Sequence, residues 1–117
     1  MHDGSFPVEV VSGVPVVTAP EEIDITNAPA LRSALVKAAA LGHGTVAVDM
    51  TRTSFCDSSG LHALLAGHKR AQAEGGELLL AFSAPAVLRV FALTGIDRII
   101  PNFTSLDEAL AQTSAHG

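Results

Sequence analysis

Two short, almost continuously apolar runs, residues 46–50 (VAVDM) and 78–82 (LLLAF), constrain the fold of this chain more than any other feature. Such runs are typical of strands that are buried on both faces, and these strands occur in parallel sheets covered by helices on each side. Amphipathic segments precede, separate and follow the two runs, so strands and helices alternate along the chain. The pattern predicts an α/β sandwich with a mostly parallel sheet.

The N-terminal part of the chain predicts an antiparallel addition to this sheet. Residues 8–11 and 14–18 are rich in valine and are separated by Ser12 and Gly13, a favourable two-residue hairpin turn. A further brief strand is expected at residues 98–100, where two isoleucines follow an arginine. We therefore expect a mixed sheet that is opened by a hairpin.

Hydrophobic spacing and cap residues predict about four α-helices. The first follows Thr26 and Asn27 and ends before Gly42, and the second begins at Ser58 or Ser59 and ends before residues 75–76. The other two are expected between residues 85 and 95 and after residue 105. Together these elements describe an α/β sandwich of one layer of sheet and flanking helices.

Length and composition exclude several classes of protein. A chain of 117 residues suffices for one domain, which we expect to span residues 1–117 with a core at about 8–111 and short flexible termini. The net charge of −5, without clustered Lys or Arg, argues against a nucleic-acid partner. No apolar run approaches the roughly 18 residues of a membrane span. The single cysteine permits no internal disulfide, so we expect a cytoplasmic protein.

The segment 55–61 (FCDSSGL) is the strongest candidate for a functional site, because it places two hydroxyls at a predicted strand-to-helix junction. The first turn of a helix offers free N–H groups and a favourable dipole, which tolerate an added phosphate. From the residues alone, either Ser58 or Ser59 is the helix cap and the other projects outward. Asp57 and Asp24 are either caps or turn residues, or they contact a partner.

The remaining reactive side chains point to no catalytic or metal site. Cys56 is interpreted as a small buried hydrophobe, with a redox role left open. His62 and His68 lie six residues apart, on different faces of the second helix, and are expected to be exposed or hydrogen-bonded rather than to bind metal. The serines lack a nucleophile elbow, and the glycine pairs lack a phosphate-binding lysine. We expect neither an enzyme nor a cofactor.

Five segments in order carry a family resemblance: residues 22–29 (EIDITNAP), 48–50 (VDM), 55–61 (FCDSSGL), 91–96 (FALTGI) and 105–110 (SLDEAL). Together they resemble bacterial anti-sigma factor antagonists, which are stand-alone STAS domains. The resemblance covers residues from about 8 to 111. It implies the STAS fold, in agreement with the α/β sandwich expected above.

The resemblance also implies a partner-switching function. An unphosphorylated antagonist binds an anti-sigma factor that is also a serine kinase of the histidine-kinase-like ATPase fold, and so releases a sigma factor. The kinase phosphorylates the serine that corresponds to Ser58, and a PP2C-type phosphatase reverses the modification. The resemblance places Asp24 and Asn27 beside that serine, and both are expected to be exposed.

The predicted partner surface combines the residues of the two segments and contains no catalytic or metal-binding group. Its members lie at or just before the starts of the first and second helices: Asp24, Asn27, Asp57, Ser58, Ser59 and Gly60. The alternative interpretation is a non-switching STAS module, which would act as a scaffold or sense a nucleotide or lipid.

Overall fold

The two apolar runs become neighbouring central strands of one sheet. In the computed structural model, which describes residues 6–41 and 44–114, β4 (Val46–Asp49) pairs in parallel with β6 (Leu78–Ala81). The five strands lie in the order β1-β2-β4-β6-β7, with β1 (Val8–Val11), β2 (Val14–Thr18) and β7 (Asn102–Phe103) completing the sheet. Only β1 and β2 are antiparallel. The predicted mixed, mostly parallel sheet is confirmed.

The hairpin between β1 and β2 turns at the predicted residues. Ser12 has φ 52° and Gly13 has φ 82°, and two successive positive φ angles are what a two-residue turn of type I′ requires. The turn fixes the register of the hairpin, in which Val11 faces Val14.

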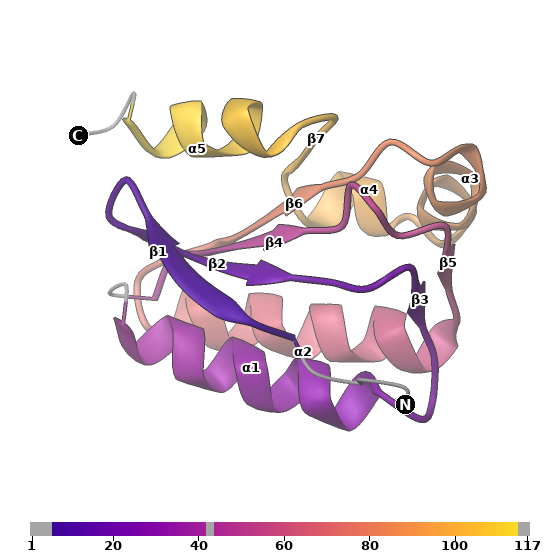
Figure 1. Cartoon of the computed structure of the whole chain (residues 1–117), viewed down its shortest axis with the longest axis horizontal. Helices are drawn as coiled ribbons and strands as arrows, with labels where there is room; N and C mark the ends of the chain where they lie inside the picture. The colour runs from indigo at the N-terminus through magenta and orange to yellow at the C-terminus, as the bar shows by residue number, and fades with distance from the viewer. Residues whose placement is uncertain (1–5, 42–43, 115–117) are drawn as a thin grey trace.

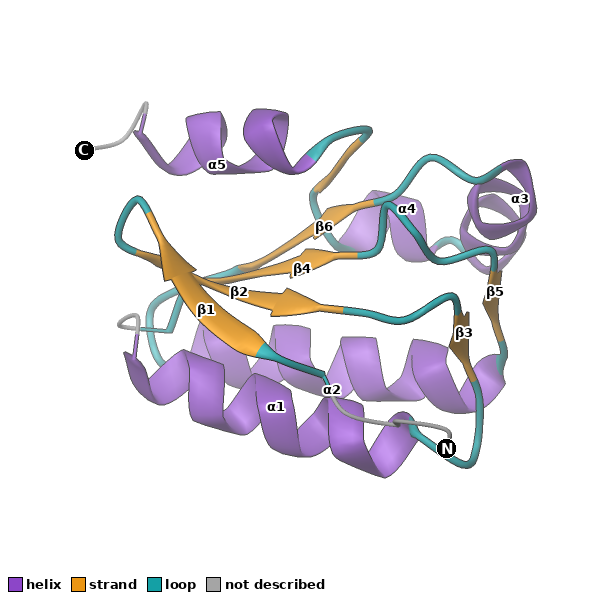
Figure 2. Ribbon diagram, viewed as in Figure 1, coloured by secondary structure: helices purple, strands orange, loops and turns teal. Residues whose placement is uncertain are grey.

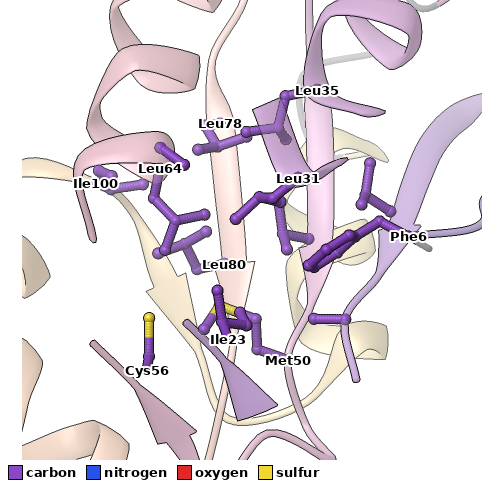
Figure 3. Close-up of a cluster of buried hydrophobic side chains, with 14 of the residues drawn as sticks. Phe6, Ile23, Leu31, Leu35, Met50, Cys56, Leu64, Leu78, Leu80 and Ile100 are labelled. Carbon is purple, nitrogen blue, oxygen red and sulfur yellow. The ribbon is translucent and has the colours of Figure 1, made fainter. Parts of the chain in front are cut away.

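Helices cover both faces of the sheet (Figures 1 and 2). On one face, α1 (Ala28–Leu41) and α2 (Ser58–Ala73) pack over the larger core, which includes Leu31, Leu64 and Leu80 (Figure 3). On the other face, α5 (Leu106–Ser114) covers a smaller cluster. Successive side chains of a strand point to opposite faces, which divides the apolar residues of each central strand between the two cores.

The region after β6 differs from the expectation. The helix α3 (Pro85–Thr94) begins at a proline and ends before Gly95, which has φ 80°, as predicted. A one-turn helix, α4 (Ile96–Ile99), then stands where residues 98–100 were expected to be a strand, so the described chain has five helices rather than about four. Ile96 and Ile100 are both buried, and their i, i+4 spacing places them on one side of a helical turn.

Some expectations cannot be compared with the structure. Gly42, predicted to lie just beyond the first helix, and most of the predicted flexible termini fall outside the described residues. Within residues 6–41 and 44–114, no helix combines the length and the apolar character that a membrane crossing needs.

Candidate functional site

The two segments of the predicted site meet in a small second sheet. The strands β3 (Glu22–Ile23) and β5 (Phe55–Cys56) pair in parallel, beside the main sheet in Figure 2. The backbone N–H of Asp57 donates to the carbonyl oxygen of Ile23 at 3.0 Å, which extends the pairing by one step. Parallel strands end at the same edge, so Asp24 and Asp57, the residues that follow them, emerge there together.

A carboxylate, and not a hydroxyl, caps α2. Asp57 Oδ1 accepts hydrogen bonds from the backbone N–H groups of Ser59 at 2.9 Å and Gly60 at 3.2 Å. The expectation that one of the two serines is the cap is therefore wrong, and the interpretation of Asp57 as a cap is confirmed. Because Asp57 already occupies these donors, an added phosphate would not find an empty anion site in the first turn of the helix.

The two serines differ in exposure. Ser58, the first residue of α2, is exposed, and in the described part of the chain no hydrogen bond engages its hydroxyl. Ser59 is half-buried and lines a pocket of about 230 Å³ between the N-terminal ends of α1 and α2, together with Ile25, Arg32 and His62. Ser58 is thus the hydroxyl that a second protein can reach without displacing a side chain.

Asn27 is buried, so its predicted exposure is wrong, and its place in a partner surface stays a prediction. Its side chain is only 3% exposed. Asn27 Oδ1 accepts from the N–H of Asp24 at 2.9 Å, and Asn27 Nδ2 donates to the carbonyl oxygen of Glu22 at 2.8 Å. A buried amide whose two ends are both hydrogen-bonded stabilises the loop between β3 and α1.

Asp24 stands at the turn of the same loop and is half-buried. Its Oδ1 accepts from the backbone N–H of Thr26 at 2.9 Å and also from the Thr26 hydroxyl. The carbonyl oxygen of Asp24 accepts from the N–H of Ala28 at 2.8 Å, at the start of α1. Asp24 therefore has the turn role that the sequence left open, and its contact with a partner stays a prediction.

Gly60 and Cys56 pack the N-terminal end of α2 against β3 and β5. Gly60 is buried, and a Cβ at this position would lie 2.6 Å from Cys56 Sγ and 2.7 Å from Ile23 Cγ2. Cys56 is 5% exposed, and burial, with a smaller effect of the Asp57 charge, raises the pKa of its thiol to about 12. The interpretation of Cys56 as a small buried hydrophobe is confirmed, and Gly60 allows the close approach.

The histidines of α2 differ from each other. His62 is exposed, whereas His68 is buried and its Nδ1 has no hydrogen-bond partner in the described structure. The expectation that His68 is exposed or hydrogen-bonded is therefore wrong for Nδ1, which is buried and has no partner in the described structure. Burial lowers the pKa of His68, and Glu77 acts in the opposite direction. Residues 6–41 and 44–114 hold no group of three or more side chains suited to a metal ion.

Two exposed apolar side chains, Ile25 and Phe55, flank the site. They were not identified as site residues from the sequence. Ile25 is 73% exposed and Phe55 is 50% exposed. The strand period of two gives a signal for Phe55, because burial of Cys56 directs the preceding side chain outward. Ile25 lies in an irregular loop, where no periodicity indicates its direction.

The comparisons with known proteins agree with this fold. The model of the STAS domain family matches residues 5–109. The anti-sigma-B factor antagonist of Bacillus subtilis (strain 168) is 34% identical over 79 residues, which are 68% of this chain and 72% of the relative. The structure of an anti-sigma factor antagonist from Mycobacterium paratuberculosis has a TM-score of 0.83 at 33% identity and covers 92% of both chains.

A third similarity concerns the fold alone. The Bacillus cell fate determinant SpoIIAA in its phosphorylated form has a TM-score of 0.70 at 23% identity, over 93% of this chain and 99% of that chain.

Proposed function

Since the chain belongs to the STAS domain family, we propose that it is an anti-sigma factor antagonist that switches partners when Ser58 is phosphorylated. The unphosphorylated chain binds an anti-sigma factor that is also a serine kinase of the histidine-kinase-like ATPase fold, and a sigma factor is released. The kinase phosphorylates Ser58 and ends the interaction, and a PP2C-type phosphatase restores it. On this proposal the chain is a cytoplasmic substrate and ligand and not an enzyme.

The accessibility of Ser58 is the observation that carries the proposal. Its hydroxyl is exposed and free of hydrogen bonds within the described residues, because the neighbouring carboxylate of Asp57 supplies the cap of α2. A kinase must bring the hydroxyl into line with the γ-phosphate of ATP, which a hydroxyl engaged in capping would oppose. Ser59 is less suited because it is half-buried.

The relatives support the same function. The relative from Bacillus subtilis and the solved protein from Mycobacterium paratuberculosis are both named anti-sigma factor antagonists. SpoIIAA was solved in a phosphorylated form, so a domain of this fold accommodates a phosphate while folded.

Electrostatics at Ser58 explain how a phosphate would end binding. Phosphorylation adds about −1.5 to −2 charges at pH 7. The added charge would lie next to Asp57, whose carboxylate already accepts the first N–H groups of α2. The phosphate therefore gains little compensation within this chain, and enclosing it in an interface built for a neutral hydroxyl costs several kcal/mol.

A kinase assay with purified components tests the proposal. Each purified histidine-kinase-like serine kinase of the source bacterium is incubated with this protein and ATP, and the products are analysed by phosphopeptide mass spectrometry. We expect one phosphate on Ser58, no labelling of Ser58→Ala, and full labelling of the matched control Ser59→Ala. Phosphate on Ser59 in the intact protein, or binding that phosphorylation leaves unchanged, would reject the switch in favour of a non-switching module.

A further inference from the structure

We propose that Ile25 and Phe55 are the apolar anchors through which the anti-sigma factor kinase binds this chain around Ser58. The inference rests on the proposed function and assigns the partner contacts of the same site. Both side chains are large, apolar and exposed, at 73% for Ile25 and 50% for Phe55.

The fold does not require either side chain to be apolar. The nearby residues Ile23 and Cys56 supply the buried positions of β3 and β5, at 0% and 5% exposure. Single exposed hydrophobic residues are common on protein surfaces, so exposure alone assigns no role to them. The position of Ile25 and Phe55 relative to Ser58 is what supports a role in partner binding.

Both residues fall within the area that a kinase must cover to reach Ser58. Phe55 precedes Ser58 by three residues, so their Cα atoms are at most about 11 Å apart. Ile25 lines the same pocket as Ser59, the residue after Ser58. A standard interface buries about 800 Å² on each partner, which corresponds to a disc of about 16 Å radius. An interface of this size centred on Ser58 is therefore wide enough to reach both residues.

The surroundings of the two anchors define the chemistry of the partner surface. Glu21 and Glu22 are exposed beside Phe55, and Asp24 and Asp57 follow the two strands. A complementary partner has an apolar depression for the phenyl ring of Phe55, bordered by Lys or Arg side chains. Buried apolar anchors within a charged rim are the usual arrangement of a specific interface.

Binding measurements with matched variants test the assignment. Phe55→Ala and Ile25→Ala are compared with Leu41→Ala, which truncates a side chain that is also exposed, at 62%, but lies at the opposite end of α1. The 14-residue helix separates the two ends of α1 by about 20 Å. The kinase that phosphorylates Ser58 in the assay above is titrated with each variant in the presence of ADP.

We expect Phe55→Ala and Ile25→Ala each to raise the Kd at least tenfold, and Leu41→Ala to change it less than twofold. In the kinase assay the KM for both anchor variants should rise while kcat stays constant, because the anchors act in binding and not in phosphoryl transfer. A melting temperature within a few degrees of the wild type shows that a variant is folded. Because Ile25 and Phe55 lie in separate segments, the two variants test the interface independently.

Two outcomes separate this inference from the proposed function. If the wild type is phosphorylated on Ser58 and both anchor variants bind as tightly as the wild type, the assignment of Ile25 and Phe55 is rejected. The proposed phosphorylation switch is then retained. If no kinase of the bacterium phosphorylates the wild type, the proposed function fails and the inference fails with it.

Discussion

Asn27 positions Asp24 from inside the fold, because its Oδ1 accepts a hydrogen bond from the Asp24 backbone N–H at 2.9 Å. The other end of the same amide donates to the carbonyl oxygen of Glu22 at 2.8 Å. A buried side chain thus stabilises the loop that carries the exposed Ile25 of the proposed interface. We therefore expect Asn27 to affect recognition through the backbone of this loop.

Asn27→Ala is expected to lower the free energy of unfolding by about 1–3 kcal/mol, since it leaves a partly buried N–H and a carbonyl without partners. Urea denaturation measures the loss. The matched control, Thr26→Ala, removes a hydrogen bond at an exposed position and should cost no more than about 0.5 kcal/mol. Equal stability of the wild type and Asn27→Ala would show that water replaces the amide.

Gly60→Ala is expected to destabilise the domain by about 1–3 kcal/mol, because the added methyl group would lie 2.6 Å from Cys56 Sγ. A double-mutant cycle with Cys56→Ala checks the cause. Removal of the sulfur should relieve part of the penalty, although the contact with Ile23 remains. Strict additivity of the two substitutions would contradict a clash at the sulfur.

Cys56 should be unreactive in the folded protein. A thiol with a pKa of about 12 contains almost no thiolate at pH 8, and burial also blocks access to it. We expect iodoacetamide to modify Cys56 only after unfolding in urea, and Cys56→Ala to leave phosphorylation of Ser58 intact. Loss of kinase binding on oxidation, absent in Cys56→Ala, would instead indicate a redox role.

His68 should make the domain less stable in mild acid. Burial lowers its pKa in the native state from the ordinary value of 6.5, so the unfolded chain binds the proton more tightly. Stability is therefore complete above pH 6.5 and decreases as the pH falls below it. Urea midpoints between pH 7.5 and 5.5 should show this decrease in the wild type and in His62→Gln, and a smaller one in His68→Gln. Identical slopes in all three would exclude His68 as the cause.

Phosphorylation of Ser58 should leave the fold unchanged. The helix dipole favours the phosphate by about 0.3–1 kcal/mol, and repulsion from the Asp57 carboxylate opposes it. The net effect should stay within about 1 kcal/mol, against the roughly 5–15 kcal/mol of a typical domain. Thermal unfolding and backbone amide NMR spectra of both forms provide the measurement. Widespread shift changes at residues far from Ser58 would show that the phosphate remodels the domain.

Local sequence signals predicted most of the fold. The apolar runs of β4 and β6, the turn at Ser12 and Gly13, and the proline and glycine that delimit α3 all have a local physical cause. The segment 98–100 was misread because β-branched residues favour strands, whereas burial of Ile96 and Ile100 on one side of a turn favours a helix. Tertiary packing therefore favours the helix over the strand in this segment.

The position of the candidate site at a strand-to-helix junction was predictable from the sequence, but its hydrogen bonds were not. The order of Asp57, Ser58 and Ser59 located the junction, but only the coordinates show which of the three caps α2. The burial of Asn27 results from hydrogen bonds to Asp24 and Glu22 in a loop without periodicity. Such contacts depend on the path of the loop, which no local pattern specifies.

The separation of the β3–β5 pair from the five-stranded sheet has an evolutionary consequence. The side chains proposed for recognition, Ile25 and Phe55, are exposed, whereas Ile23 and Cys56 of the same strand pair belong to the core. If Ile25 and Phe55 are the partner contacts proposed above, substitutions there after gene duplication would change the partner while the core stays under the same selection. Copies of one stable fold in the same genome can therefore acquire different partner specificities.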